Sequence, residues 1–381
     1  MKAITNKRIA IVGGGPGGLT LARLLQQSGA AIKVYERDVN KDVRVQGATL
    51  DLHDDTGLRA LRHAGLIEAF KANYRPGADR TCIVDKDATI RLDEHVNKAE
   101  EFSRPEIDRG PLRKILLESL EPDTVVWNSY LVSLSKLGEA WKLEFQNGES
   151  AVADLVIGAD GANSKIRPFI TPGRPFFAGV TAIEGTVYHA ETAAPAIYKL
   201  LGGGKIFALD EEKTLIVSAK GDGSLSFYAG YKTDEDWVRA SGIDFSDRGQ
   251  VLGWFKQEFA SWNEIWLELF EQAALPLIPR PQYCMPLDQR WDTLPNLTML
   301  GDAAHLMPPY AGEGVNMAML DALELSICLT DERLADTRAA IARYEERMLA
   351  RFAEVAAMTL EQTASLHSSH ALSDMLALFG Q

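Results

Sequence analysis

The chain has 381 residues, which is long enough for two domains or for one large domain with a second inserted into it. Its composition, 46% hydrophobic and 24% charged residues, is ordinary for a globular protein with a sizeable core. The net charge of −13 argues against nucleic acids and anionic membrane surfaces as partners, because phosphate binding needs a basic face.

The three cysteines, Cys82, Cys284 and Cys328, lie far apart and form no C-x-x-C motif. We therefore expect neither a disulfide framework nor a metal site, and we expect a cytoplasmic location. The first strand is expected within eight residues of the N-terminus, with no apolar leader before it. No uncharged apolar run reaches the roughly 18 residues that span a membrane.

The N-terminal segment has the pattern of a strand, a glycine-rich turn, a helix and a second strand. Residues 8–12 read as a short buried strand, residues 19–28 as a helix, and residues 32–35 as a strand that stops at Glu36. The turn between the first strand and the helix is G-x-G-x-x-G, in the context that its mechanism requires. This segment predicts a dinucleotide site without settling which dinucleotide binds.

Each glycine of this turn has a distinct expected task. Gly13 makes the tight turn, Gly15 lets the backbone approach a pyrophosphate, and Gly18 lets helix and strand pack closely. The helix N-terminus offers unpaired N–H groups to the phosphates. Glu36 follows Gly18 by 18 residues, where a carboxylate accepts hydrogen bonds from an adenosine ribose.

The next part of the chain mixes short strands and helices. One helix is expected over residues 109–120, because apolar residues recur there at helical spacing. The other expected elements are an extended segment at 48–52, a helix at 54–64, a hairpin at 81–92, a strand at 124–127, an antiparallel pair at 130–137 and 141–145, and a buried strand at 153–159.

From about residue 175 the pattern changes to consecutive strands separated by Gly-rich or charged turns. The expected strands are 180–188, 205–209, 214–219 and 225–231, which indicate a largely antiparallel sheet. Helices are expected at 234–240 and 248–271. Their many aromatic residues favour packing over cofactor binding.

A strand, a loop and a helix return near the C-terminal end. The expected elements are a strand at 297–300, a Pro- and Gly-rich loop at 307–314, and helices at 315–329, 335–366 and 370–379. The chain therefore predicts an α/β fold with a split first domain, residues 1–173 plus 288–330. A mainly antiparallel sheet domain, residues 174–287, is inserted into it, and residues 331–381 form helices that bridge the two.

Two further motifs place an aspartate at the end of an expected strand. One is Gly158–Gly161, with Asp160, and the other is the segment 301–316, which begins with Gly301 and Asp302. Ligands bind at the carboxyl ends of strands in open α/β sheets, although Asp-Gly alone is also a common turn dipeptide.

Together with the N-terminal motif, in this order and spacing, these segments resemble the single-component (class A) FAD-dependent aromatic monooxygenases of the para-hydroxybenzoate hydroxylase type. The resemblance covers nearly the whole chain and implies a three-layer, Rossmann-like FAD-binding domain of the GR2 type. Within that family the chain most resembles the Tet(X)-type tetracycline-inactivating monooxygenases. The matching segments include residues 13–16, 24–27, 34–38, 49–53 and 301–309.

The resemblance implies roles for individual residues. Asp302 is expected to bind the ribityl–phosphate region of FAD, Asp160 to serve both FAD and NAD(P)H, and Arg44 to bind NADPH. The full set expected to bind FAD is Gly13, Gly15, Gly18, Glu36, Arg37, Asp51, Arg109, Asp160, Asp302, Gly312, Gly314 and Val315.

Elementary chemistry agrees with several of these roles. Arg109 and Arg113 stand in the first turns of a helix, which is unfavourable for cations unless they pair with phosphates or carboxylates. The alternative is a solvated basic face. The N–H groups at Gly314 and Val315 open a helix and suit the pyrimidine ring of a reduced, anionic flavin. His305 is interpreted as a packing or hydrogen-bonding residue rather than a base.

The reaction implied by the resemblance belongs to the flavin, so neither a catalytic side chain nor a metal is expected. NADPH reduces FAD, O2 adds at flavin C4a to give a hydroperoxide, and an electron-rich enol or phenol carbon takes the terminal oxygen. There is one G-x-G-x-x-G, because Phe207 stands where a second motif beginning at Gly202 requires glycine. We therefore expect no second Rossmann site for NADPH, and the resemblance implies that NADPH binds transiently at the surface. The protein is expected to be a monomer acting on a small molecule.

The inserted sheet is expected to supply the substrate face. On the strands that contact tetracycline in Tet(X)-type proteins, this chain departs from the family pattern, so its hydrogen-bonding groups differ. Glu184 and Lys205 are expected to pair with each other, to bind a zwitterionic ligand, or to be ordinary surface residues. The candidate substrate residues are Glu184, Lys205, Phe207, Ser218, Ser226 and Pro308.

Three functions remain open at this stage. The main hypothesis is a monooxygenase that inactivates tetracyclines, or hydroxylates another polycyclic enol, and so confers antibiotic resistance. The second is an aromatic hydroxylase of the same fold with another substrate. The third is a non-oxygenase flavoprotein, such as a reductase, a ligand-sequestering protein or a redox sensor.

Overall fold

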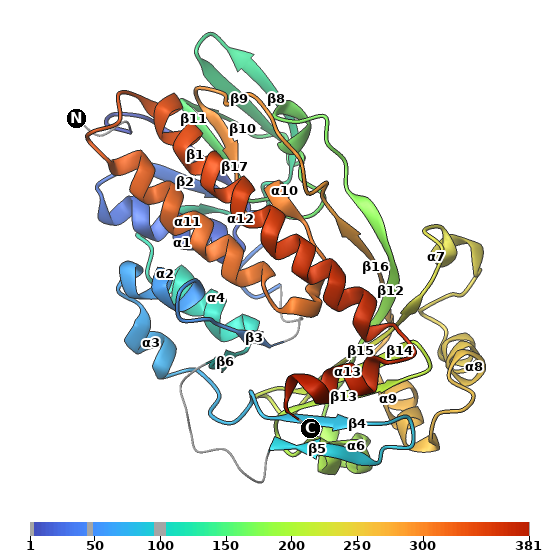
Figure 1. The fold of residues 1–381 in the computed structure, drawn as a ribbon. Helices are drawn as coiled ribbons and strands as arrows, with labels where there is room; N and C mark the ends of the chain where they lie inside the picture. The colour runs from blue at the N-terminus through green and yellow to red at the C-terminus, as the bar shows by residue number, and fades with distance from the viewer. Residues whose placement is uncertain (1–3, 44–48, 95–103, 381) are drawn as a thin grey trace.

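The computed structural model describes residues 4–43, 49–94 and 104–380, which form two lobes joined by long strands and a long helix (Figure 1). The first lobe is built on a parallel sheet in the order β17-β11-β1-β2-β7. All four residues of β1 and of β11 are buried, as expected for central strands of a parallel sheet covered on both faces. The five strands are β1 (Ile9–Val12), β2 (Ile32–Tyr35), β7 (Val125–Val126), β11 (Leu155–Gly158) and β17 (Leu297–Met299).

Helices cover one face of this sheet, and a small antiparallel sheet adds a further layer. Helix α1 (Pro16–Gln27) packs against α11 (Gly314–Thr330), which in turn packs against α12 (Thr337–Leu366) (Figure 1). The additional sheet consists of β8 (Leu131–Leu137), β9 (Ala140–Phe145) and β10 (Ser150–Ala153). The helices between β2 and β7 are α2 (Gly57–Ala64), α3 (Ile67–Lys71) and α4 (Arg109–Glu118), and β3 (Leu50–Asp51) pairs with β6 (Glu106–Ile107) beside them.

The second lobe is built on a seven-stranded sheet in the order β16-β12-β15-β14-β13-β4-β5. Its N-terminal hairpin, β4 and β5, corrects an expectation, because the sequence pattern placed residues 81–92 in the first part of the chain. β4 pairs in parallel with β13, so this hairpin completes the sheet of the second lobe. The strands are β4 (Thr81–Val84), β5 (Ile90–Asp93), β12 (Phe176–Val187), β13 (Lys205–Asp210), β14 (Lys213–Ala219), β15 (Leu225–Lys232) and β16 (Ile278–Cys284).

Strand alternation gives this sheet two different faces. Ile206, Val217 and Phe227 point to one face, where they join an aromatic core with Trp254 and Phe270. Residues one position away, such as Phe207, Ile216 and Tyr228, point to the other face and are directly opposite one another across the strands. The first face is therefore buried in the core, whereas these three residues of the second face are only partly buried.

The aromatic helices confirm their packing role but not their expected length. A single helix was predicted over residues 248–271, whereas the structure has three pieces: α8 (Arg248–Glu258), η3 (Glu264–Trp266) and α9 (Leu267–Gln272). The side chain of Asn263 accepts a hydrogen bond from the backbone N–H of Ile265, which caps a new turn and explains the break. The other helices of this lobe are α5 (Ala190–Ala193), α6 (Pro195–Leu201) and α7 (Trp237–Ala240).

Helix α12 runs from the first lobe to the second, and α13 (Ala371–Leu378) follows it beside β13 (Figure 1). Both helices were predicted to within a few residues. Within the described residues, no helix combines the length and the apolar character needed to cross a membrane. The remaining short elements are η2 (Arg167–Phe169), α10 (Asp302–His305) and η4 (Pro309–Ala311).

Candidate functional site

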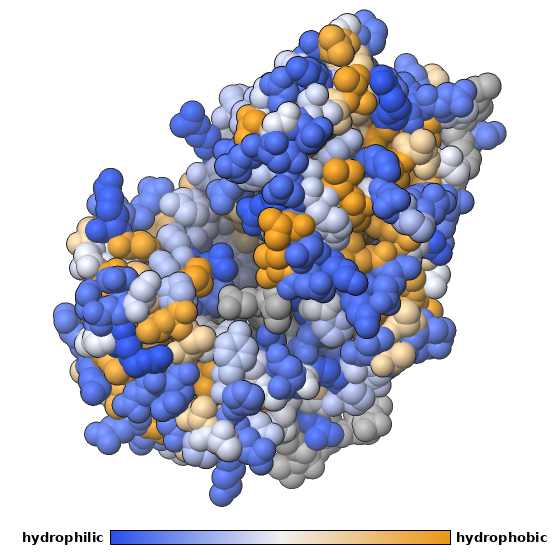
Figure 2. All heavy atoms as spheres, turned by 180° about the vertical axis from the view of Figure 1, so that it is seen from behind, coloured by the Kyte–Doolittle hydropathy of each residue, from blue (hydrophilic) through white to orange (hydrophobic). Residues whose placement is uncertain are grey.

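A cavity of about 1000 Å³ lies where the two lobes meet. Seen from the side opposite to Figure 1, the surface is hollowed between the lobes (Figure 2). Residues of all three glycine- or aspartate-bearing motifs line this cavity, and so does the open face of the seven-stranded sheet. The volume is at the upper end of the range for small-molecule sites, which suits a cofactor together with a substrate.

The glycine turn has the geometry that its residues predict. Gly13 has a φ of +111°, and a Cβ atom there would overlap the carbonyl group of Ala159. A Cβ atom on Gly18 would overlap the carbonyl oxygen of Gly13 in the same way. At Gly15 a Cβ atom would meet nothing within 4 Å, so the backbone there is open to the cavity. The cradle thus leaves room for a phosphate to approach the main chain.

Glu36 is held firmly at the end of β2. Its side chain is buried, and Oε2 accepts a hydrogen bond of 2.6 Å from the N–H of Gly14. Oε1 accepts another, of 3.0 Å, from the N–H of Asp38. Its neighbour Arg37 is exposed and also lines the cavity. The carboxylate is therefore oriented before any ligand arrives.

In the second motif, one carboxylate oxygen of Asp160 has no hydrogen-bond partner among the described residues. Oδ2 of Asp160 accepts a hydrogen bond of 2.6 Å from the N–H of Lys165. Oδ1 is buried and has no hydrogen-bond partner among the described residues. Burial raises the pKa of Asp160 in spite of its hydrogen bonds from Ser164 and Lys165. A buried acceptor without a partner at a cavity wall is a place where a ligand donor fits.

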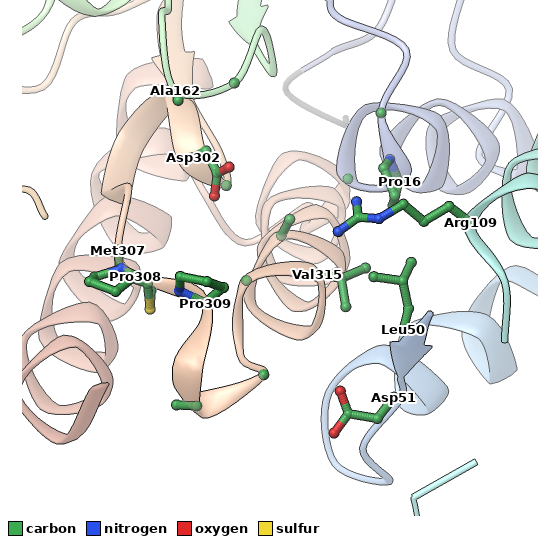
Figure 3. A pocket seen from close by; sticks show the side chains of 18 of the residues that line it. Pro16, Leu50, Asp51, Arg109, Ala162, Asp302, Met307, Pro308, Pro309 and Val315 are labelled. Carbon is green, nitrogen blue, oxygen red and sulfur yellow. The ribbon is translucent and has the colours of Figure 1, made fainter. Parts of the chain in front are cut away.

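Asp302 stands at the start of α10, across the cavity from Arg109. The two side chains point into the space from opposite sides (Figure 3). Asp302 is exposed to the cavity, as is Arg109. The protein around the carboxyl group raises the pKa of Asp302, although His305, Arg109 and Arg167 each act to lower it. A carboxyl group and a guanidinium on opposite sides of one cavity suit the polar middle of an extended ligand.

Arg167, which is not among the site residues expected from the sequence, joins two motifs. Its guanidinium donates to the carbonyl oxygens of Asp302 at 2.7 Å, Ala303 at 2.8 Å and Ala162 at 2.9 Å. The side chain is buried, so these bonds are shielded from water. No local pattern could have shown this, because 135 residues separate Arg167 from Asp302.

Arg113 settles one of the alternatives for the first turns of α4. Its guanidinium pairs with Asp38 at 2.9 Å and lies over the ring of Trp127, 5.4 Å from the ring centre. The solvated basic face is therefore wrong for Arg113, which is buried. Arg109, one turn earlier, is the arginine that lines the cavity.

Asp51 lies beside the loop that opens α11, and a residue that the sequence analysis passed over holds it there. Asn316 donates from Nδ2 to the carbonyl oxygens of Asp51 at 2.9 Å and Gly312 at 3.3 Å. Burial opposes ionisation of Asp51, but the hydrogen bond with His53 and the charges of Lys205 and Arg104 outweigh it. The pKa of Asp51 falls to about 2.

The loop before α11 brings backbone and apolar groups to the cavity. Gly312, Gly314, Val315 and Pro308 all line it (Figure 3 labels the last two). Gly312 has a φ of +72°, and a Cβ atom there would lie 3.1 Å from Oδ1 of Asp51. The positive φ therefore favours glycine at this position, and the close approach of Asp51 leaves little room for a side chain.

The substrate residues expected on the inserted sheet divide into two groups. Lys205, Phe207 and Ser218 line the cavity, whereas Glu184 and Ser226 are not among its lining residues. Arg44 lies outside the described residues.

Of the three alternatives for Glu184 and Lys205, the pairing with each other is wrong. Three strand spacings separate β12 from β13, about 14 Å in all, because β14 and β15 lie between them. Glu184 instead pairs with Arg280 at 2.8 Å. Lys205 pairs with the buried Glu106 of the first lobe. Burial raises the pKa of Glu106 although Lys205 lowers it.

His305 has the expected hydrogen-bonding role. It is buried, its Nε2 lies 2.5 Å from Oδ2 of Asp321, and its ring stacks against Phe352. It is not among the residues that line the cavity.

Comparison with known proteins finds one matching family model and several similar proteins. The family model described as "FAD binding domain" matches residues 6–192 and 292–359. The monooxygenase asqM of Emericella nidulans is 30% identical over 372 residues, covering 84% of this chain and 83% of that protein. The 3-amino-4-hydroxybenzoate 2-monooxygenase PtmB3 of Streptomyces platensis is 29% identical, covering 96% and 91%.

Among solved structures, the tetracycline destructase Tet(51) superposes with a TM-score of 0.75 over 99% of this chain and 95% of its own. Its sequence identity is 17%, so this likeness shows the fold alone.

Proposed function

The chain belongs to the FAD binding domain family and is a flavin-dependent monooxygenase of the hydroxylase type, and from this premise we propose that it hydroxylates a polycyclic enol or phenol, with tetracyclines as the first candidates. The cavity supports the proposal because it combines cofactor-binding features with a separate, mostly apolar wall. FAD, when bound, supplies the reduction of O2 and the transfer of one oxygen atom. We propose NADPH as the reductant and O2 as the second substrate.

The residues of the first lobe fit FAD. The open backbone at Gly15, the preoriented carboxylate of Glu36 and the unpartnered oxygen of Asp160 each offer a group that an extended dinucleotide can use. We propose that Glu36 holds the adenosine ribose and that Arg109 and Asp302 hold the polar middle of the cofactor. The N–H groups that open α11, at Gly314 and Val315, then face the ring end.

We propose that the second lobe supplies the substrate wall. Phe207, Ile216 and Tyr228 stand side by side across β13, β14 and β15, facing the cavity. The loop that carries Pro308 and Tyr310 lines the cavity as well. Flat ring systems pack well between such apolar surfaces, which also exclude water from the reacting carbon.

The cation Lys205 lies at the edge of this apolar wall and favours a substrate with an anionic oxygen. Lys205 sits two residues from Phe207 on the same face, and its ammonium group is held by Glu106. An ammonium in a partly buried cavity stabilises an enolate or phenolate oxygen, and such oxygens activate the adjacent carbon toward an electrophilic oxygen donor. The observation that carries the proposal is therefore the pairing of Lys205 with a flat apolar row.

A second candidate is an aromatic hydroxylase that acts on a smaller carboxylated ring. Arg280, which pairs with Glu184, also lines the cavity, so its guanidinium and the ammonium of Lys205 are two hydrogen-bond donors for the carboxylate of an aromatic acid. One relative is named as acting on 3-amino-4-hydroxybenzoate, which is such an acid. Membership of a monooxygenase family argues against the third possibility, a flavoprotein that is not an oxygenase.

We also propose a division of the chain into domains. Residues 1–173 and 288–330 form the FAD-binding part, except that β4 and β5 belong with residues 174–287 in the substrate part. Residues 331–381 bridge the two, since α12 contacts α11 and α13 contacts β13.

The deciding experiment combines oxygen consumption with mass spectrometry. The purified protein is incubated with NADPH and either a tetracycline or a set of hydroxylated aromatic acids. We expect substrate-stimulated NADPH oxidation and a tetracycline product heavier by one oxygen atom. An unchanged tetracycline together with a hydroxylated aromatic acid would instead establish the second candidate.

A further inference from the structure

Behind the turn that presents Asp302 lies a buried carboxylate, Asp321 on α11, that the proposed function does not use. Its Oδ2 atom accepts a hydrogen bond of 3.0 Å from the N–H of Gly301 and lies 2.5 Å from Nε2 of His305. Its Oδ1 atom accepts a hydrogen bond of 2.7 Å from Arg351 on α12. The side chain has no exposed surface.

These contacts hold both ends of the short segment Gly301–His305. Gly301 precedes α10 and His305 is its last residue, so Asp321 touches the segment on either side of Asp302. A four-residue helix has almost no stability of its own, because nucleation costs more than one turn of hydrogen bonds returns. The direction in which Asp302 points therefore depends on what holds its two ends.

The unusual backbone conformation of Gly301 makes its hydrogen bond to Asp321 especially important. Its backbone, at φ +59° and ψ −147°, occupies a region open only to glycine. A Cβ atom there would lie 3.0 Å from the Cβ of Ala318 on α11, so the turn is pressed against that helix. The hydrogen bond from Gly301 to Asp321 fixes this turn in place.

The carboxylate is in turn fixed from α12. Arg351 balances its charge, and Glu324 on α11 holds the other side of the same guanidinium at 2.8 Å. A buried charge that lacked such partners would be strongly destabilising. The group is thus a rigid unit of charged side chains from two long helices, placed directly behind the cavity wall.

We propose that Asp321, through His305 and Gly301, is a positioning residue that aims the Asp302 carboxylate at the middle of the cofactor. This inference rests on the proposed role of Asp302 in binding FAD. It predicts a selective defect: loss of Asp321 weakens binding of the flavin half of FAD and leaves binding of the adenosine half unchanged. The adenosine half is proposed to lie at Gly13–Glu36, and no hydrogen bond or ion pair among the described residues joins that segment to Asp321.

The test compares FAD with AMP on the full-length chain freed of flavin. Dissociation constants are measured by calorimetry for the natural protein and for Asp321→Asn. We expect the constant for FAD to rise about tenfold, the size expected when a hydrogen bond to a charged group is lost, and the constant for AMP to stay within about twofold. An equal loss for both ligands, or no loss for either, would overturn the proposal.

Two further variants keep the result interpretable if Asp321→Asn folds poorly. His305→Leu removes the donor to Asp321, whereas His305→Gln keeps an N–H donor, so we expect FAD binding to be weaker in the first and largely restored in the second. Equal FAD affinity in the two would contradict the proposal.

Glu345→Gln is the matched control. Glu345 is another buried carboxyl group on α12, bonded to Thr298 on β17, but it does not touch the Gly301–His305 segment. We expect its FAD and AMP constants to match those of the natural protein, and a selective FAD defect in this variant would count against the proposal. A natural protein that binds AMP but not FAD would refute the proposed cofactor rather than the positioning role.

Discussion

The guanidinium of Arg167 donates a hydrogen bond of 2.7 Å to the main-chain carbonyl oxygen of Asp302. This contact joins the motif that follows β11 to the motif that follows β17, at the carboxyl ends of two paired parallel strands. The same side chain bonds the carbonyl oxygens of Ala162 and Ala303, so one buried cation fixes both aspartate-bearing turns.

Arg167→Lys is expected to reduce stability markedly. Lysine cannot reproduce three directed bonds from a planar fork, and the carbonyl groups would lose buried partners. We expect the free energy of unfolding to fall by roughly 2–4 kcal/mol, measured by urea denaturation of the flavin-free protein. Arg8→Lys is the control, because Arg8 pairs with Asp154 at the surface, and its effect should be clearly smaller. Equal effects would contradict the bridging role.

Asp302→Ala is expected to purify without yellow colour. The carboxylate lines the cavity opposite Arg109, and its removal leaves the middle of the cofactor without this partner. Bound flavin absorbs at about 450 nm, so the ratio of this absorbance to that of the protein at about 280 nm measures the fraction of the protein that carries flavin. Glu118→Ala, on the exposed side of α4, is the control and should stay yellow. A fully yellow Asp302→Ala would count against the proposed contact with FAD.

Lys205→Met is expected to raise the KM for the substrate by about tenfold, because the variant loses one charge-assisted hydrogen bond to it. Steady-state kinetics at fixed NADPH measures it, and Lys205→Arg should retain most of the affinity.

Because Lys205→Met leaves Glu106 buried without its cation, the double variant with Glu106→Gln separates binding from folding. If the double variant recovers both stability and KM, Lys205 acts only as a structural partner of Glu106.

His367 gives the protein a pH dependence of known sign. Burial lowers its pKa from 6.5 to about 4, and its Nδ1 bonds the carbonyl oxygen of Thr363 at 2.8 Å. Because the folded pKa lies below the unfolded value, the unfolded chain takes up the proton first as the pH falls. The contribution of neutral His367 is complete above pH 6.5 and is lost as the pH falls from 6.5 to about 4. The expected loss is about 3 kcal/mol.

His367→Gln isolates this effect, since buried carboxyl groups such as Glu345, whose pKa is raised, act with the opposite sign. The difference in unfolding free energy between the natural protein and this variant should shrink between pH 7 and pH 4.5, as followed by urea titrations at each pH. A difference that does not change with pH would show that His367 is not held neutral.

Much of the first lobe follows from local pattern, because each step of the pattern has a local physical cause. Gly13 is favoured by its φ of +111°, and Gly18 by its contact with the carbonyl oxygen of Gly13 in the same turn, so their spacing predicts that turn. The helix at α12 was predicted because apolar residues recur at helical period between Ile341 and Val355. The hairpin β4–β5 was predicted as a hairpin but assigned to the wrong sheet, since its parallel partner β13 lies more than 100 residues later.

The sequence by itself determined that this protein holds a dinucleotide and that Asp160 and Asp302 follow strands of one sheet, because such motifs depend on short-range spacing. Only the tertiary structure decided which charges meet: Lys205 with Glu106 rather than Glu184, Arg167 with the carbonyl of Asp302, and Asp321 with His305. Ion pairs and buried hydrogen bonds depend on distances of a few ångströms between residues far apart in the chain. Strand order and helix packing set those distances, and short segments of the sequence considered separately determine neither of them.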